Sequence, residues 1–235
     1  MGLGLEVGIL ADLKDVDEEG YTSYVEDFAR LNIALRAEGL GEHVEPDDLD
    51  EVFSCDMMGY SRIHCLRRIA MHLALGHPVP APGNRETDFN GVPTAEYFDA
   101  FGAEKDMKYQ HLIVHSDADG FYVPIDFERV ICTPSLQGSW VGSTQRLRAE
   151  CAELASMLGI PSGMDYDSDE LSRAVSAQLD PGRRSAPRLW PWKRAEIEPS
   201  NDLMWKRYAV EADACLRLLT ACEASLLVKA AIVFC

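Results

Sequence analysis

The chain has 235 residues, of which 39 are Asp or Glu and only 22 are Lys or Arg, so its formal net charge is −17. This charge argues against binding to nucleic acid, because proteins that bind nucleic acid carry a basic surface. It also argues against binding to anionic membrane surfaces. We therefore expect neither nucleic acid nor a membrane among its partners. Hydrophobic residues make up 47% of the chain, which is ordinary for a globular protein with a real core.

The acidic residues are concentrated near the start of the chain, in the runs 12–19 (DLKDVDEE) and 42–51 (EHVEPDDLDE). Dense runs of like charge usually form solvated loops and helix N-termini, and we expect that structure for both runs. A negative surface also steers basic molecules toward it. The charge therefore favours a basic protein as the partner.

The first hundred residues alternate between strand, helix and loop patterns. Residues 3–10 alternate and are rich in Val, Ile and Leu, which predicts a first strand. Apolar residues recur at three- and four-residue spacing in three later segments, which predicts helices over 18–38, 60–75 and 94–101. Between the last two, residues 78–93 are rich in Pro and Gly and predict a long loop.

A β-hairpin is predicted over residues 108–127. The sequence DADG at 117–120 is a strong turn signal, because Asp bonds its own backbone and Gly accepts a positive φ. With this loop, both strands bury the same side, as a specified hairpin requires. The buried residues are Leu112, Val114, Phe121, Val123 and Ile125. The residues left together on the polar face are His111, His115, Tyr122 and Asp126.

The remaining chain is mostly helical. A short strand is expected around residues 130–132, followed by amphipathic helices over 143–158 and 167–179. Residues 180–199 are rich in Pro, Arg and Trp and predict a connector or a flexible insertion before the C-terminal helix, which runs from 200 to 227. The fold class expected is α+β: a mostly helical single domain, 1–235, with a small antiparallel sheet that includes the hairpin.

The helix predicted at 60–75 carries an unusual polar side. When the helix is projected at one hundred degrees per residue, the apolar residues form a core face. The opposite side holds two histidines and two arginines, namely His64, Arg67, Arg68 and His72. Such a set suggests an anionic group nearby. The hairpin could supply it through Asp117, Asp119 or Asp126, and a bound carboxylate or phosphate could supply it instead. The favoured alternative is an ion-pair cluster between helix and hairpin without any ligand.

The ligand-binding candidates are therefore His64, Arg67, Arg68, His72, His111, His115, Tyr122 and Asp126. A metal site is the sharper alternative, since two histidines and a carboxylate form a common ligand set. Its candidate ligands are His111, His115, Asp117 and Asp119, with Asp126 as another carboxylate and His64 as a fourth ligand. The spacing matches no tight consensus, so the main expectation is no cofactor, with a divalent metal as the alternative.

The seven cysteines include no CxxC pair, which favours reduced thiols over a disulfide framework. The opening MGLGLEVGIL has neither the basic region nor the cleavage site of a signal peptide. We therefore expect a cytoplasmic protein.

Three segments resemble those of a group of uncharacterised bacterial proteins: CDMMGYSRIHCLRR at 55–68, HLIVHSDADGFYVPIDF at 111–127 and GSWVGSTQRLRAEC at 138–151. The group's corresponding patterns are CDMxGYSxLHxLRR, HSDxxGxYVPxDF and VGSSxRLxxEC. Thr144 stands where the group usually has a second serine. The resemblance implies a bacterial, cytosolic, single-domain protein and carries no established activity.

Three functional hypotheses follow, and whether the protein is an enzyme stays open among them. The first is a non-enzymatic binding protein, such as an acidic inhibitor or an immunity-type protein that acts on a basic partner. The alternative is a metal-assisted hydrolase that uses the polar face of the 111–126 hairpin together with His64 and Arg68. The third is a sensor that binds a small anionic ligand at Arg67 and Arg68.

Overall fold

The computed structural model of the chain describes residues 3–57, 60–83, 94–103, 106–116, 119–136, 138–180 and 204–234. The helices in this part of the chain are α1 (Ile9–Leu13), α2 (Glu18–Ala37), α3 (Tyr60–Ala74), α4 (Thr94–Ala103), α5 (Gln110–Ile113), α6 (Thr144–Leu158), α7 (Asp169–Leu179), α8 (Met204–Arg207) and α9 (Ala209–Val228). The strands are β1 (Gly4–Val7), β2 (Phe53–Asp56), β3 (Phe121–Val123), β4 (Ile131–Cys132), β5 (Trp140–Ser143) and β6 (Ile232–Phe234).

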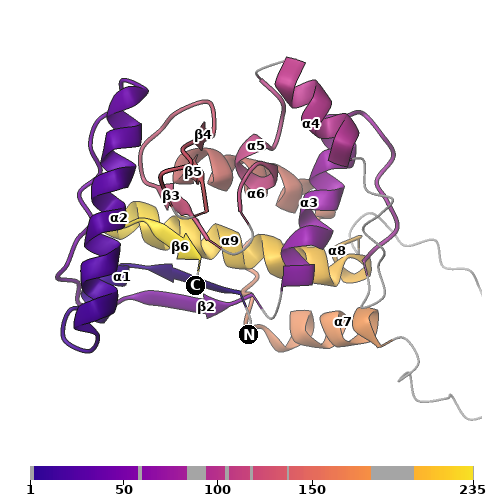
Figure 1. Cartoon of the computed structure of the whole chain (residues 1–235). Helices are drawn as coiled ribbons and strands as arrows, with labels where there is room; N and C mark the ends of the chain where they lie inside the picture. Colours follow the sequence, from indigo (N-terminus) through magenta and orange to yellow (C-terminus); the bar gives the residue numbers. More distant parts are fainter. Residues whose placement is uncertain are drawn as a thin grey trace, which may run out of the picture.

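The six strands form one mixed sheet in the order β2-β1-β6-β3-β5-β4 (Figure 1). Strands β3 and β5 pair in parallel, and the other neighbours pair antiparallel. The C-terminal strand β6 lies between β1 and β3, so the sheet joins segments from both ends of the chain.

Helices cover both faces of the central strands. On one face, Phe28 of α2 packs edge-on against Phe121 of β3, with the ring centroids 5.3 Å apart. On the other face, Tyr122 belongs to a second apolar core that includes buried residues of α3, α6 and α9. Because successive side chains of a strand point to opposite faces, β3 is buried on both sides.

The α+β class is confirmed, and so are most of the predicted helices. Ser168 caps α7 by accepting a hydrogen bond from the backbone N–H of Leu171. The first strand is shorter than predicted, because Gly8 has φ of 92° and turns the chain into α1. The C-terminal helix is interrupted at Tyr208, which separates α8 from α9.

The predicted hairpin at 108–127 is wrong. Residues Gln110–Ile113 form the helical turn α5, and β3 pairs with β5 and β6. Of the two strands that the alternating pattern predicted, only the second is a strand, namely β3. Its partners β5 and β6 come from later segments of the chain. The sheet is also mixed, where an antiparallel one was expected.

Residues 181–199 of the predicted connector lie outside the described residues, and the extent of the domain stays a prediction. Among the described residues, no helix is both long and apolar enough to cross a membrane. The six cysteines that the structure describes are free thiols.

Candidate functional site

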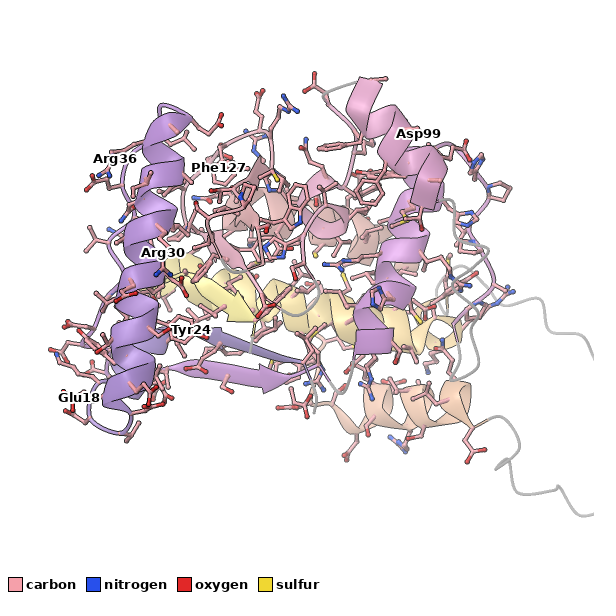
Figure 2. The ribbon with its side chains drawn as sticks, viewed as in Figure 1. Glu18, Tyr24, Arg30, Arg36, Asp99 and Phe127 are labelled. Carbon is pink, nitrogen blue, oxygen red and sulfur yellow. The ribbon has the colours of Figure 1, made fainter. Side chains whose placement is uncertain are left out.

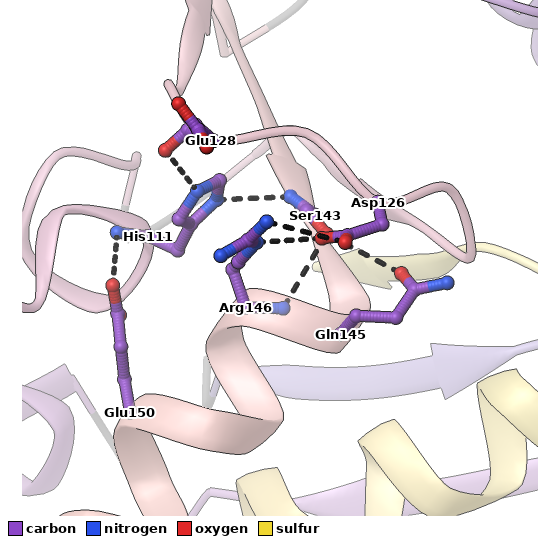
Figure 3. Close-up of polar contacts among 7 residues, drawn as sticks. All are labelled: His111, Asp126, Glu128, Ser143, Gln145, Arg146 and Glu150. Carbon is purple, nitrogen blue, oxygen red and sulfur yellow. Dashed lines mark hydrogen bonds and ion pairs between the residues drawn. The ribbon is translucent and has the colours of Figure 1, made fainter.

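His111 lies in the interior, within the short helix α5, and both of its ring nitrogens form hydrogen bonds (Figure 3). The backbone N–H of Ser143 donates to Nδ1 over 3.0 Å. The proton therefore resides on Nε2, which donates to the carbonyl oxygen of Glu128 over 3.1 Å. Burial lowers the pKa of His111 to about 4, so the imidazole is neutral near pH 7.

Glu150 of α6 holds the start of α5. Its two carboxyl oxygens accept hydrogen bonds from the backbone N–H groups of His111 and Leu112, at 3.1 and 2.8 Å. These N–H groups would otherwise lack a partner, as at every helix N-terminus. Burial raises the pKa of Glu150 to about 8. The hydroxyl of Tyr122 donates to the carbonyl oxygen of His111 over 2.7 Å, which joins the turn to the sheet.

Arg67 of α3 binds the other end of α5. Its Nε donates to the carbonyl oxygen of Leu112 over 2.7 Å, and its Nη2 donates to that of Ser116 over 3.2 Å. The side chain belongs to a residue that is only 5% exposed. Arg67 thus connects α3 to the chain around α5, and it is buried although it lies opposite the core face predicted for this helix.

His115 stacks on Tyr122, with ring centroids 4.0 Å apart and an interplanar angle of 12°. Its Nδ1 lies 3.0 Å from the carbonyl oxygen of Ser116, and its Nε2 lies 3.2 Å from that of Phe121. Burial lowers the pKa of His115 to about 4. The predicted neighbourhood of His115 and Tyr122 is therefore real, but it is buried.

The predicted site residues thus separate into two groups. Arg67, His111, His115 and Tyr122 converge in the interior around α5. The remaining candidates are less deeply buried. Arg68 donates to the carbonyl oxygen of Ala81, His72 Nδ1 lies 3.0 Å from that of Pro78, and His64 is half-buried on α3.

Asp126 is exposed and forms an ion pair with Arg146 of α6, at 2.5 Å from its Nε (Figure 3). Among the residues that the structure describes, no three His, Cys, Asp or Glu side chains are grouped as metal ligands. Asp117, one of the candidate ligands, lies outside the described residues, and the backbone N–H of Asp119 donates to Ser116 Oγ. A ligand-binding role for these residues stays a prediction.

A second candidate site is the surface of the first part of the chain. Residues 3–57 contain sixteen Asp and Glu but only three Lys and Arg, a net charge of −13 out of −17. Figure 1 shows α1, α2 and the loop that follows α2 at one end of the molecule. We define the acidic face by its exposed carboxylates: Asp12, Asp15, Asp17, Glu18, Glu19, Glu26, Glu38, Glu42, Asp47, Asp48, Asp50 and Glu51.

The three cations of this segment pair with carboxylates of the same segment. Lys14 Nζ lies 3.2 Å from Asp47 Oδ2, Arg36 pairs with Glu42, and Arg30 pairs with both Glu26 and Asp27. The cations therefore hold acidic residues in place, while the net negative charge of the face remains large. Glu18, Arg30 and Arg36 mark the length of α2 in Figure 2.

The loop after α2 is anchored from within. The side chain of Asn32 forms two hydrogen bonds with the backbone of His43, each 2.8 Å long. His43 Nε2 lies 2.6 Å from Glu45 Oε2, and both side chains are almost fully buried. The same Glu45 oxygen accepts a hydrogen bond from the backbone N–H of Ala231 beside β6, at 2.7 Å.

The sequence identified the acidic runs but not this anchoring. Glu45 sits inside a run that the pattern predicts to be solvated, yet it is buried. Asn32 gives no signal of its own in the sequence, because its partner is eleven residues away along the chain.

Comparison with known proteins identifies a family for this chain. A family model described as "Putative DNA-mimic protein" matches residues 1–234, and no curated protein or solved structure matches significantly. The family description points to partners related to nucleic acid, which corrects the expectation of no nucleic acid among the partners. A surface of the same sign as DNA fits the surfaces to which DNA binds.

Proposed function

Because the chain belongs to the family described as "Putative DNA-mimic protein", we propose that its acidic face occupies the DNA-binding surface of a DNA-binding protein and keeps DNA away from it. The observation that carries this proposal is the acidic face, whose exposed carboxylates lie on α1, α2, the turn between them and the loop after α2, at one end of a protein that matches the family along nearly its whole length.

The size of the acidic face suits this role. A helix of 20 residues such as α2 is about 30 Å long at 1.5 Å per residue. That length corresponds to about nine base pairs of duplex, which carry about 18 phosphate charges. The exposed carboxylates that define the acidic face are of the same order in number. The acidic face therefore offers a DNA-binding surface a comparable number of charges over a comparable distance.

The placement of the charges is supported by the packing below them. Asp17 caps α2 by accepting a hydrogen bond from the backbone N–H of Gly20, at 3.0 Å. The loop that carries Asp47, Asp48 and Asp50 is anchored through His43 and Glu45. Carboxylates on a fixed scaffold need little ordering when they bind, and this lowers the entropic cost of association.

The other hypotheses receive less support. The hydrolase hypothesis uses the polar face of the predicted hairpin together with His64 and Arg68. One residue of that face, His111, is 1% exposed, and both of its ring nitrogens are bonded to the backbone. The immunity-type hypothesis has no support in the family description, which names DNA mimicry instead.

The test is a competition between the protein and DNA for the same partner. The protein is immobilised, exposed to a nucleic-acid-free lysate of the cells in which it occurs, and washed with either a short DNA duplex or polyglutamate at the same charge concentration. We expect duplex DNA to displace a bound protein at a lower concentration than polyglutamate does. The purified partner should then bind DNA in a gel-shift assay, and the free chain should release that DNA.

If polyglutamate displaced the partner at the same concentration as duplex DNA, the binding would depend on negative charge alone and not on mimicry of DNA. A captured protein that binds the chain and DNA at the same time would also contradict the proposal, because the two must then use different surfaces.

A further inference from the structure

Exposed aliphatic side chains gather in the same segment as the charge. Among the described residues, seven large hydrophobic side chains are exposed. Five of these lie between residues 16 and 52: Val16, Val25, Ile33, Val44 and Val52. Single exposed hydrophobic residues are normal on any protein, but their concentration in one region often marks an interaction surface.

Two of these residues belong to one stripe along α2. Val25, Ala29, Ile33 and Ala37 are all exposed and recur every four residues, so they lie next to one another along the helix. We call these four residues the aliphatic ridge. The buried side of the same helix, with Phe28, Leu31 and Leu35, packs toward the sheet. The core therefore does not need the ridge.

The surroundings of the ridge are charged. Glu26 and Arg30 pair beside it at 2.9 Å, and Arg36 pairs with Glu42 near its end. Carboxylates of the acidic face occupy the first turn of α2, at Glu18 and Glu19. An apolar centre with a charged rim is the usual composition of a specific protein–protein interface. A surface that only repeated the charge of DNA would not need the apolar centre.

We propose that the aliphatic ridge is the apolar contact of the acidic face, and that it packs against apolar side chains lying between the DNA-binding cations of the partner. This inference rests on the proposed function. A second copy of the chain is a poor occupant of the ridge, because the exposed carboxylates around it would repel an identical surface. A DNA-binding surface carries the complementary charge.

The two kinds of contact differ in their response to salt. Ions screen the attraction between exposed charges, so the contribution of the carboxylates weakens as the salt concentration rises. Contact between apolar side chains does not depend on this screening. The ridge should therefore contribute the same factor to the affinity at every salt concentration. Because only some DNA-binding proteins carry apolar side chains at the matching place, the ridge should also allow the chain to discriminate among them.

The experiment compares the Val25→Ser/Ile33→Ser double variant with the wild type, using as probe the purified partner that duplex DNA displaces from the immobilised chain. We expect Kd to rise about tenfold, by the same factor at low and at high salt. The matched control is Phe98→Ser, which removes an exposed hydrophobic side chain from α4, far from α2 in Figure 1. That variant should bind like the wild type.

Circular dichroism and the Tm of each variant check that the fold is intact, which the exposure of both side chains favours. An unchanged Kd for the double variant, with DNA displacement still observed, would overturn the inference and leave the proposed function standing. If no DNA-displaceable partner exists, both fall. A wild-type chain that sediments as a dimer, and a double variant that sediments as a monomer, would assign the ridge to a second copy and overturn the inference.

Discussion

The side-chain amide of Asn32 bonds the backbone of His43 in both directions: its Nδ2 donates to the carbonyl oxygen, and its Oδ1 accepts from the N–H, each over 2.8 Å. One side chain of α2 thereby fixes the start of the acidic loop. The loop then continues into the buried pair of His43 and Glu45. The arrangement of the exposed carboxylates thus depends on a few buried polar contacts.

Replacing Asn32 by Ala should loosen this loop. Both backbone groups of His43 lose their partner in a part-buried site, and we expect the free energy of unfolding to fall by about 1–3 kcal/mol. Urea denaturation measures this change. Ser23→Ala, an exposed position on the same helix, is the control and should leave stability within about 0.5 kcal/mol. Equal stability of the two variants would show that the amide does not anchor the loop.

Neutralising charge at the start of α2 should weaken binding in a salt-dependent way. In the Glu18→Gln/Glu19→Gln variant, we expect slower association with the DNA-binding partner and a shallower dependence of log Kd on log salt concentration, because exposed charges act mainly on the encounter. Surface plasmon resonance at several salt concentrations measures both. The matched control is Asp99→Asn/Asp106→Asn, which removes two exposed charges outside the acidic face. An equal effect of the two variants would mean that net charge alone matters.

Stability should depend on pH through Glu150. Its pKa is raised by burial from an ordinary value near 4.5 to about 8, so between these values the folded chain binds a proton that the unfolded chain releases. The contribution of this group is therefore present at low pH and is lost as the pH rises toward 8. We expect the free energy of unfolding of the wild type, relative to Glu150→Gln, to decline over this range in urea titrations.

Glu153→Gln is the control for that measurement. Glu153 lies one turn further along α6, and the hydrogen bond from Tyr109 lowers its pKa, so its contribution is lost only at lower pH. A wild type whose stability relative to Glu150→Gln does not change between about pH 5 and 8 would contradict the role assigned to Glu150.

The two buried histidines should act in the opposite direction. Burial lowers the pKa of His111 and His115 to about 4, from an ordinary value of 6.5, so the unfolded chain takes up protons that the folded chain does not. Their contribution to stability is full above pH 6.5 and is lost as the pH falls toward 4. Replacing His111 by Gln should reduce the slope of stability against pH in this window. An unchanged slope would mean that His111 can be protonated in the folded state.

Gly142 should not accept a side chain. A Cβ at this position of β5 would lie 2.3 Å from the ring of Tyr122 on the neighbouring strand, so Gly142→Ala should destabilise the fold by about 1–3 kcal/mol. The control is Gly102→Ala in α4, where a Cβ meets no atom within 4 Å. Since Ala favours the helix over Gly, this control should keep or raise the Tm. A tolerated Gly142→Ala would show that the ring of Tyr122 can move.

By itself, the sequence determined the α+β class, most of the helices and the negative charge of the first part of the chain. Helix stripes such as Leu147, Cys151, Leu154 and Leu158 are periodic within one segment, so the segment alone specifies which side is buried. The net charge is a sum over residues, so the sequence alone fixes it and shows that the acidic residues are concentrated in the first part of the chain.

Only the tertiary structure decided how β3 pairs and which acidic residues are exposed. Alternation in Phe121–Val123 is compatible with any neighbour, and the actual neighbours are Val141 and Val233, which no local pattern relates to it. Because β3 is buried on both faces, His111 and His115 lie in the interior. There they and Tyr122 form hydrogen bonds with backbone groups of neighbouring segments. Glu45 is buried and Asp48 is exposed for the same reason: long-range packing, not sequence neighbours, decides which carboxylates a partner can reach.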